Sequence, residues 1–422
     1  MLLKTPDYYK DFRCIAGACK DSCCIGWEID IDEDTKTYYE QVKGSFGERL
    51  RAHMVQADQE DIDPQTGLCM TSFELSEGRR CPFLNEENLC DICIELGEEA
   101  LSEVCTEYPR FTMEYFCDIE KPYTLIREKC MALSCEEVGR LLFTREEAVK
   151  VETRELPDQD WMEEDREEWE SEEDEEDEEE NREEARLAGL LLQARDYAIQ
   201  ILQKRNLDLI NRIVAYIDFY SQIQQLLNEN REDEIPGLIQ SWECTGNQDK
   251  MGNSGEIEDI DPFRQPKRAM KDSFFARQEG YDKMEILDEE WRTCLLQMRE
   301  WYTNTAETEI HQTLRRLNQE IQGREYEQEH LLVYFTFRYM MRAVFDRNVL
   351  CHAQFTVVSF LTIRDMALVR FASRGHFTVQ DCIDVVRIYS KEVEHSEENL
   401  DLLRDCFLYD EIFEPGQLKH QL

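Results

Sequence analysis

The sequence lacks the features of several large protein classes. It has no run of 18 apolar residues and no basic segment followed by an apolar one at its start, so it predicts neither a membrane span nor a signal peptide. It has no G-x-G, G-x-S-x-G or H-E-x-x-H motif. Those absences argue against a Rossmann nucleotide domain, an α/β-hydrolase and a zinc protease of that type.

Basic residues are also scarce. Lys and Arg number 48 against 93 Asp and Glu, and the formal net charge is -45. Because phosphate contacts need clustered Lys and Arg, this charge argues against non-specific binding to nucleic acid or to an anionic membrane. The charge is compatible with a basic protein partner, although solubility alone also accounts for it.

The composition predicts two domains and a linker. With 422 residues, of which 41% are hydrophobic, the chain is long enough for more than one core. We expect a cysteine-rich metal domain at residues 1–150, an acidic linker at 151–184 and an all-helical domain at 185–422. The stretch Glu163–Glu184 holds 17 acidic residues and 2 arginines, so it cannot bury apolar surface. Such a tract is typical of a solvated linker, and the alternative is that it attracts a lysine-rich protein surface.

The second half has the apolar spacing of helices throughout. Helical periodicity is expected at 187–202, 213–227, 291–301, 309–321, 330–349, 355–371 and 379–393, with Gly375 as a break. Glycines and prolines among acidic residues predict a long loop at 232–265. In the first half we expect a short strand at 27–31, helices at 32–42 and 98–108, and a loop-rich region at 69–93. The predicted fold class is therefore mainly α, without a Rossmann sheet.

Cysteine is the most informative residue type. Twelve of the 17 cysteines lie in the first 135 residues, and four form the run Cys14-x4-Cys19-x3-Cys23-Cys24. The odd total and the five scattered later cysteines suit a reducing cytosol, which disfavours disulfides. His53 is the only histidine in the first 150 residues, so a metal site there should be all-cysteine.

The spacing favours an iron–sulfur cluster over zinc. Structural zinc usually binds separated C-x2-C pairs, and only Cys90 and Cys93 have that spacing. The adjacent Cys23 and Cys24 suit a cluster better than one tetrahedral ion. Cys81, Cys90, Cys105 and Cys135 lie in patterned surroundings and are candidates to complete the site. A cysteine can instead pack as a small buried hydrophobic residue. For Cys90 and Cys105 the two roles are equally plausible, and for Cys69, Cys117, Cys130 and the five late cysteines the packing role is favoured.

Several motifs together resemble one family. They are the run from Cys14 to Cys24 followed by Trp27, Ile31 and Asp32, then CPFLNEENLCDICIELGEEALSEVCTEYPR (81–110) and LSCEEVGRLL (133–142). This order is similar to the flagellin lysine N-methylase family, which is related to a wider group of cysteine-rich iron- or zinc-chelating domains. FTFRYMMRAVFD (335–346) and SFLTIRDM (359–366) are also similar to its helical half. Two features depart from the family pattern: the extra cysteines Cys93 and Cys130, and the acidic tract.

The resemblance implies a cytoplasmic protein-lysine N-methyltransferase. It implies flagellin as the substrate, S-adenosylmethionine as the methyl donor and a [4Fe–4S] cluster held by cysteines. The positions that match the cysteine motifs are Cys14, Cys19, Cys23, Cys24, Cys81, Cys90, Cys105 and Cys135. The competing functions are a non-enzymatic zinc- or iron-chelating protein and an iron–sulfur redox protein.

Methyl transfer to lysine needs a neutral amine, so the enzyme must lower the lysine pKa or supply a base. Candidates beside the cysteines are Glu107, Tyr108 and Glu128, each of which is also a common surface or structural group. Arg110 is a candidate to bind the donor's carboxylate, or it forms a surface ion pair. An open iron of the cluster is a further candidate to hold the donor. The expected active site lies between the cysteines and the helical half, with Tyr334, Phe337, Arg338 and Arg342 either lining it or forming helix core.

Overall fold

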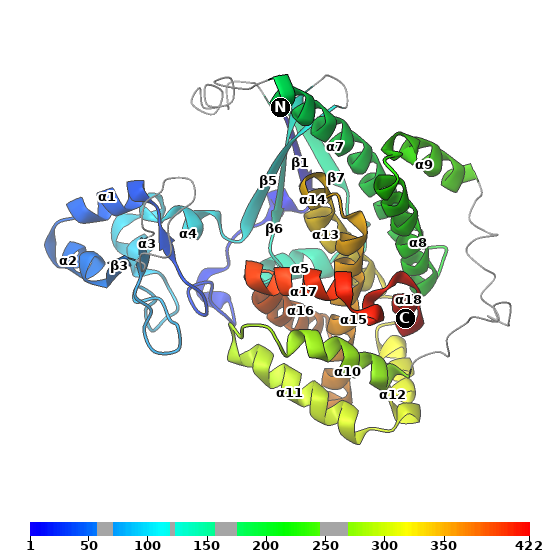
Figure 1. Cartoon of the computed structure of the whole chain (residues 1–422). Helices are drawn as coiled ribbons and strands as arrows, with labels where there is room; N and C mark the ends of the chain where they lie inside the picture. The colour runs from blue at the N-terminus through cyan, green and yellow to red at the C-terminus, as the bar shows by residue number, and fades with distance from the viewer. Residues whose placement is uncertain (57–70, 119–122, 157–174, 245–268) are drawn as a thin grey trace.

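The computed structural model describes residues 1–56, 71–118, 123–156, 175–244 and 269–422. It divides into a small cysteine-rich unit and a larger, mainly helical body (Figure 1). The small unit comprises the described part of residues 14–107 and projects from one side of the body. The body contains the other described residues. Each has its own hydrophobic core.

Helix α15 (Val349–Arg374) runs through the centre of the body, and nearly all of its side chains are buried. It packs against α8, α13, α16 and α17. The Asn348 side chain accepts the Cys351 N–H at 3.0 Å and caps its start, and Gly375 ends it in the left-handed conformation with φ +75°. The other helices of the body are α5 (Glu136–Phe143), α7 (Glu175–Leu202), α8 (Leu209–Asn228), α9 (Ile235–Cys244), α10 (Met270–Tyr281), α11 (Glu289–Asn304), α12 (Glu307–Glu320), α13 (Tyr326–Tyr339), α14 (Ala343–Asp346), α16 (Val379–Val393), α17 (Glu397–Tyr409) and α18 (Pro415–Gln421).

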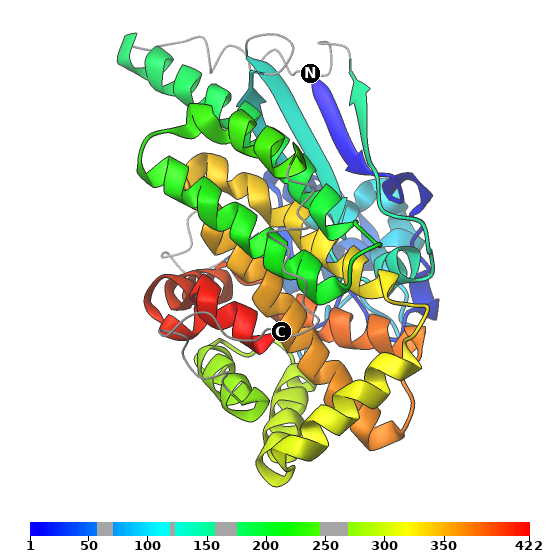
Figure 2. The same ribbon diagram turned by 90° about the vertical axis from the view of Figure 1, so that its right-hand side faces the viewer.

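A four-stranded sheet from the first 156 residues belongs to the body. Its order is β5-β6-β1-β7. The strands are β1 (Leu2–Pro6), β5 (Arg110–Cys117), β6 (Thr124–Met131) and β7 (Val151–Glu155). Strands β5 and β6 form an antiparallel pair, β1 lies parallel to β6, and β7 is antiparallel to β1. Figure 2 shows these strands beside the green helices, in keeping with the packing of β5 on α7.

Buried ion pairs join this sheet to the helices. The Arg195 guanidinium of α7 donates to the Glu128 carboxylate of β6 at 2.6 and 2.7 Å. The Tyr115 hydroxyl donates to the same carboxylate at 2.9 Å. All three side chains are almost completely buried. Because a buried charge is unfavourable without its partner, this contact permits only one alignment of strand β6 with helix α7.

The small unit contains short elements around a compact core. It has a three-stranded antiparallel sheet in the order β2-β4-β3, made of β2 (Asp30–Ile31), β4 (Thr71–Phe73) and β3 (Met54–Gln56). Its helices are α1 (Glu33–Gln41), α2 (Gly44–His53), α3 (Asp91–Leu96) and α4 (Glu103–Glu107). The buried core consists of Ile29, Ile31, Tyr39, Leu50, Phe73, Cys81, Phe83, Leu84, Ile92 and Ala100.

Most helix predictions for the second half are confirmed. The helix expected at 379–393 has those bounds, because Thr378 and Asp381 form a capping box at its start. The expected segments at 187–202, 213–227, 291–301, 309–321 and 355–371 lie in α7, α8, α11, α12 and α15. The segment at 330–349 is divided among α13, a 3-10 turn and α14, and Arg347 has φ +53° after α14. None of the helices in the described ranges is long and apolar enough to cross a membrane.

In the described part of the first 150 residues, α-helix outweighs strand as expected, but the four-stranded sheet was not predicted. The described residues of 1–12 and 109–156 contain all four strands of this sheet, whose buried side chains join the core of the body. The unit that folds around its own core is therefore smaller than the expected 1–150 domain. Residues 151–155, expected in the linker, form β7 because they pair with β1. The end of the acidic tract begins α7 at residue 175, and residues 157–174 lie outside the described residues.

Within the loop expected at 232–265, residues 235–244 form α9. Proline at the second position of α9 is tolerated, because the first N–H groups of a helix have no intrahelical acceptor. Residues 245–268 of that expected loop lie outside the described ranges. The expected short strand at 27–31 is present only as β2, and the helix expected at 32–42 is α1 with Asp32 as its cap.

Candidate functional site

The eight cysteines singled out by the sequence lie on distant segments of the small unit and at its border with the body, and some are close enough to influence one another's pKa. Cys14 and Cys19 flank a 3-10 turn, Cys23 and Cys24 follow it, Cys81 and Cys90 flank a tight turn, Cys105 lies in α4, and Cys135 immediately precedes α5. All eight are free thiols in the structure. Their arrangement separates into two groups.

The inner set packs on the core of the small unit. It consists of Cys24, Cys81, Cys90 and Cys105. The Cys81 N–H donates to the Cys24 carbonyl at 2.8 Å, which joins two segments far apart in the sequence. A β-bridge then pairs Leu84 with Cys90. Cys81 is buried, and the other three are half-buried.

The outer set lies where the small unit meets the body. It consists of Cys14, Cys19, Cys23 and Cys135. Cys14 and Cys23 are exposed, and the other two are half-buried. The Lys20 N–H donates to the Glu136 carboxylate at 2.9 Å, which holds Cys19 beside the first turn of α5. The loop of residues 14–20 also touches the turn before Cys90, since Gly17 lies against Glu87 and Leu89.

Burial makes these thiols hard to ionise. It raises the pKa of Cys19 and Cys81 to about 12, and that of Cys105 and Cys135 to about 11. Neighbouring thiols of the same set add to the shift in Cys19 and Cys81. Thiolates at these positions therefore need a nearby positive charge, which a bound metal would supply.

The two sets meet at the adjacent cysteines. A hydrogen bond between the two thiols lowers the pKa of Cys24 to about 7 and raises the pKa of Cys23. Beyond that contact, Cys24 influences the pKa of Cys81 and Cys105, whereas burial and the Cys24 charge also raise the pKa of Cys23, with smaller contributions from Cys14 and Cys105. One residue of the pair thus adjoins mainly the inner set, and the other lies at its edge, toward the outer set.

The donor chemistry fits a thiophilic metal group. Thiolates are the usual ligands of iron–sulfur clusters and common ligands of zinc. Among the described residues, no three Cys, His, Asp or Glu side chains converge on one point as they would around a bound metal. A metal group could bind here only if the thiols turned toward one another.

The remaining early cysteines have other surroundings. Cys117 and Cys130 are buried in the core of the body, which confirms that they pack as small hydrophobes. Cys130 contacts the Tyr8 hydroxyl at 3.9 Å. Cys93 lies half-buried one turn after Cys90 on α3. Cys69 lies outside the described residues.

Four side chains fill the border beside the outer set, and we call them the junction cluster. They are Trp27, Tyr108, Ser134 and His395. The Trp27 and His395 rings stack with centroids 4.8 Å apart, and Tyr108 lies 5.6 Å from Trp27. Ser134 Oγ is 2.7 Å from His395 Nε2 and 3.1 Å from the Tyr108 hydroxyl, in two hydrogen bonds. Ser134 directly precedes Cys135, so the cluster adjoins the outer set.

The electrostatics of the junction cluster disfavour added positive charge. Burial first, and then the positive charges of Arg338 and Lys391, lower the pKa of His395 to about 3. The imidazole is therefore neutral near neutral pH. The Lys391 ammonium lies 5.4 Å from the centre of the Trp27 ring. Burial raises the pKa of Tyr108 well above its ordinary value.

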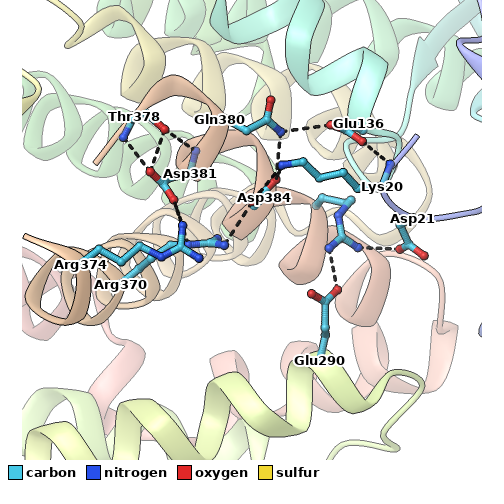
Figure 3. A network of polar contacts seen from close by, with 11 residues as sticks. Lys20, Asp21, Glu136, Glu290, Arg370, Arg374, Thr378, Gln380, Asp381 and Asp384 are labelled. Carbon is cyan, nitrogen blue, oxygen red and sulfur yellow. Dashed lines mark hydrogen bonds and ion pairs between the residues drawn. The ribbon is translucent and has the colours of Figure 1, made fainter. Parts of the chain in front are cut away.

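A network of charged residues holds the cysteine loop on the body (Figure 3). Asp21 pairs with Arg387 of α16 at 2.6 Å, and Arg387 pairs in turn with Glu290 of α11, also at 2.6 Å. Lys20 reaches Asp384 of α16 at 3.2 Å. Asp21 also pairs with the buried Lys391 ammonium at 2.9 Å. The loop from Cys19 to Cys23 is therefore fixed against α16 at two successive residues.

The structure places the catalytic candidates proposed from the sequence in different environments. Tyr108 belongs to the junction cluster. Glu128 is wrong as a base, because its carboxylate is sequestered with Arg195 under the sheet. Glu107 ends α4 and is half-buried. The half-buried Arg110 lies over the Phe12 ring at 5.1 Å.

Helix α13 is mainly core, and a 3-10 turn at Met340–Arg342 follows it. Tyr334 and Phe337 are buried, and the Tyr334 hydroxyl donates to Glu394 at 2.9 Å. Arg338 also pairs with Glu394 at 2.9 Å, and it lies near enough to lower the pKa of His395. Arg342 is at the surface and pairs with Glu397. The core interpretation is thus confirmed for Tyr334 and Phe337, while Arg338 lies between core and junction.

The body carries the signature of a known family. Residues 195–420 match the FliB lysine N-methylase C-terminal domain. The chain belongs to the FliB lysine N-methylase family. The matched residues include α13 and α16, and they supply His395, Lys391 and Arg338 to the junction.

Curated relatives agree with the family but cover only part of the chain. The chain is 25% identical over 152 residues to the lysine-N-methylases of Salmonella choleraesuis (strain SC-B67) and Salmonella typhimurium (strain LT2). That alignment covers 36% of the chain and 35% of each relative, so the chain spans about a third of their length. It is 26% identical over 134 residues to the flagellar biosynthetic protein FliU of Salmonella muenchen, covering 32% of the chain and 72% of that protein. No solved structure matches the chain.

His395 could not be found from the sequence. It follows α16, far along the chain from Trp27 and the cysteines, and no motif surrounds it. Trp27 does stand within a recognisable motif, because it directly follows Gly26 and lies three residues after Cys24. Only the fold brings the two rings together.

Proposed function

We propose that the protein is a cytoplasmic lysine N-methyltransferase. It transfers a methyl group from S-adenosylmethionine to lysine ε-amino groups of flagellin, and it depends on a [4Fe–4S] cluster held by the N-terminal cysteines. The family and the names of the two lysine-N-methylases support the reaction class. The name of the FliU relative supports a flagellar substrate.

One observation supports the position of the active site. The family-matching helices and the cysteine loop meet at the junction cluster, where Trp27 of the loop stacks on His395 of the body. The outer thiols lie beside this contact. A substrate bound there would touch both halves of the molecule.

The reaction is a displacement at carbon. The lysine nitrogen bonds to the methyl carbon, the carbon–sulfur bond of the sulfonium breaks with its electrons going to sulfur, and the nitrogen loses one proton. An ordinary lysine, with a pKa of about 10.4, is protonated near neutral pH and cannot attack. The site must therefore favour the neutral amine.

The junction supplies that preference. The burial and the two positive charges that lower the pKa of His395 to about 3 act in the same direction on an ammonium group placed beside it. Tyr108 and Ser134 offer hydroxyl oxygens that accept a hydrogen bond from the amine. The neutral imidazole and the Trp27 ring give the lysine side chain an apolar surface to lie against.

The cysteines provide the metal ligands. When bound, the cluster would supply iron as a Lewis acid for the amino and carboxylate groups of the methyl donor. This chemistry accounts for donor binding by a chain that has no glycine-rich nucleotide loop. Arg110 is a further candidate for the donor carboxylate.

The test begins with anaerobic purification, an absorbance spectrum and analysis for iron, sulfide and zinc. The iron-loaded protein is then incubated with flagellin and methyl-labelled S-adenosylmethionine, and modified lysines are located by mass spectrometry. We expect about four irons per chain, as a [4Fe–4S] cluster requires, and labelled lysines. His395→Gln should lower the rate at least about tenfold, which corresponds to about 1.4 kcal/mol. The matched change at an exposed histidine, His376→Gln, should leave the rate unchanged.

Iron-loaded protein without transfer to any lysine of flagellin would overturn the proposal. A reducible cluster without transfer would favour the redox function. A colourless zinc protein would favour the chelating function.

A further inference from the structure

The border between the small unit and the body is mainly polar. Among the described residues, the two hydrophobic cores have no side chain in common. The contacts across the border include the charged pairs of Lys20 and Asp21 and the stacking of Trp27 on His395 (Figure 3). Two parts of a chain that meet through a polar border are expected to move relative to each other.

Asp21 joins the small unit to helix α16. Its Oδ2 accepts from the Arg387 guanidinium at 2.6 Å and from the Lys391 ammonium at 2.9 Å. Arg387 also pairs with Glu290 of the body at 2.6 Å. Lys391 also pairs with Asp288 of the body at 2.8 Å. Both cations would therefore keep a carboxylate if Asp21 moved away, so this separation would leave no unpaired buried charge.

The contacts of Lys20 follow the same rule. Its ammonium pairs with Asp384 at 3.2 Å, and Asp384 also pairs with Arg370 at 3.2 Å. The Lys20 N–H donates to the Glu136 carboxylate, which also accepts from the Gln380 side chain at 3.1 Å (Figure 3). The body thus has its own partners for the groups that the small unit contacts. Such a border can separate and close again without a large electrostatic penalty.

The junction cluster is closed in this structure. The Trp27 and His395 rings stack with centroids 4.8 Å apart, which leaves no room for another side chain between them. Ser134 is only 5% exposed, and its hydroxyl is hydrogen-bonded to His395 and Tyr108. The surfaces that would receive a lysine are therefore in contact with one another. A lysine side chain could reach them only after Trp27 had moved away from His395.

We propose that the small unit is a hinged lid over the junction cluster, and that Asp21 is its latch. The lid opens when Asp21 leaves Arg387 and Lys391, and the loop that carries Asp21 then separates Trp27 from His395. The motion is inferred from the contacts alone. Its purpose, the admission of a substrate lysine, rests on the proposed function.

Chemical labelling of His395 tests the lid. Diethylpyrocarbonate modifies neutral imidazoles, and peptide mass spectrometry measures the rate at each histidine of the full-length protein. Wild type is compared with Asp21→Asn, which removes the charge of the latch. The matched control is Asp34→Asn, at an exposed aspartate in α1 of the small unit. The exposed His376 is the internal standard in every sample.

We expect His395 in Asp21→Asn to be labelled about tenfold faster relative to His376, a factor that corresponds to about 1.4 kcal/mol in the opening equilibrium. Asp34→Asn should match wild type. Wild type should also be labelled faster when the ionic strength rises from about 0.01 M to about 1 M, because the Debye length falls from about 30 Å to about 3 Å. Hydrogen exchange in α1 and α2 should stay slow throughout, because the small unit remains folded as it moves.

Two results would overturn the lid. One is equal labelling of His395 in Asp21→Asn and wild type, and the other is a wild-type rate that does not change with salt. If Asp21→Asn also loses exchange protection in α1 and α2, the substitution has unfolded the small unit. The salt response of wild type then decides the question, because it needs no substitution.

Methyl transfer to flagellin is measured separately. If the lid admits the substrate, Asp21→Asn should lower the KM for flagellin, because a larger fraction of the protein is open. Faster labelling with unchanged KM and kcat would show that the motion does not control substrate entry. Faster labelling without methyl transfer by either protein would refute the proposed function and leave the lid supported.

Discussion

The small unit and the body are stabilised in different ways. The body buries apolar side chains from its helices and from the four-stranded sheet in one continuous core. The small unit has a far smaller core, made of residues from short helices and strands of two or three residues. A small domain with so little buried apolar surface is marginally stable without cross-links. The comparison indicates that the body folds by burial of apolar surface, and under the proposed function we expect metal ligation to stabilise the small unit.

Charge is also used differently in the two regions. In the body, buried carboxylates are matched to arginines, as in Glu128 with Arg195 and Glu329 with both Arg205 and Arg212. In the small unit, the buried ionisable groups are mainly thiols, whose raised pKa values leave them protonated. A metal would convert them to thiolates and release protons. Metal binding there should therefore weaken as the pH falls.

Removal of metal should have the largest effect and should separate the two regions. Structural thiolate sites contribute on the order of 10 kcal/mol of folding free energy. After anaerobic dialysis against a chelator, we expect hydrogen exchange to accelerate across residues 21–56 and 71–107. Helices α8, α13 and α15 should keep their protection. Equal loss of protection in both regions would contradict the comparison.

Breaking a buried ion pair in the body should have the next largest effect on stability. Arg195→Leu leaves the Glu128 carboxylate buried without its partner, which should cost about 3–5 kcal/mol of unfolding free energy. The matched control on the same helix is Arg186→Leu, which removes a half-exposed partner of Asp233 and should cost less than about 1 kcal/mol. Denaturant titration followed by circular dichroism measures both. Similar losses of unfolding free energy for the two changes would show that the buried pair contributes no more to stability than the exposed pair.

The local part of this fold could be predicted, and the non-local part could not. Helix α16 was bounded correctly because Thr378 and Gly375 act within a few residues of their own position. The pairing of β1 was missed because its partners β6 and β7 lie more than a hundred residues away, and because β1 and β7, with five residues each, are too short to show a clear periodicity. Strand pairing of that kind depends on the whole fold.

The candidate site was also predictable only in its local part. Cysteine spacing predicts a metal group and the thiols that would hold it, because several of the candidate ligands lie close in the sequence. It could not separate the inner from the outer set, since that division depends on the contact of Cys24 with Cys81. His395 was missed for the same reason, as its partners Trp27 and Ser134 are distant in the sequence.

A change at Gly26 should loosen the contact between the two regions by a moderate amount. Gly26 has φ +109°, and an added Cβ would lie 3.0 Å from Cε of the buried Lys391. Gly26→Ala should therefore cost about 2 kcal/mol, partly from backbone strain and partly from displacing Lys391. Gly78→Ala is the control, because Gly78 also has a positive φ but nothing within 4 Å of an added Cβ.

In Gly78→Ala, backbone strain alone should lower the unfolding free energy by about 1 kcal/mol. Limited proteolysis near residues 19–27, together with thermal denaturation, compares the two variants. We expect faster cleavage at the border only in Gly26→Ala. Equal cleavage in both variants would show that the Lys391 contact does not hold the loop.

The smallest effect should be a pH dependence that arises at the junction. The folded-state pKa of His395 is lowered from 6.5 to about 3, so between these values the unfolded chain binds one more proton than the folded chain. Stability from this group is therefore complete above about pH 6.5 and falls as the pH drops toward 3, by at most about 1.4 kcal/mol per pH unit. Denaturation midpoints at about pH 7.5, 6.5 and 5.5, which bracket the ordinary histidine pKa, should fall more steeply for wild type than for His395→Gln. His376→Gln should behave as wild type. Equal slopes in all three proteins would mean that His395 does not oppose protonation at the border of the two regions.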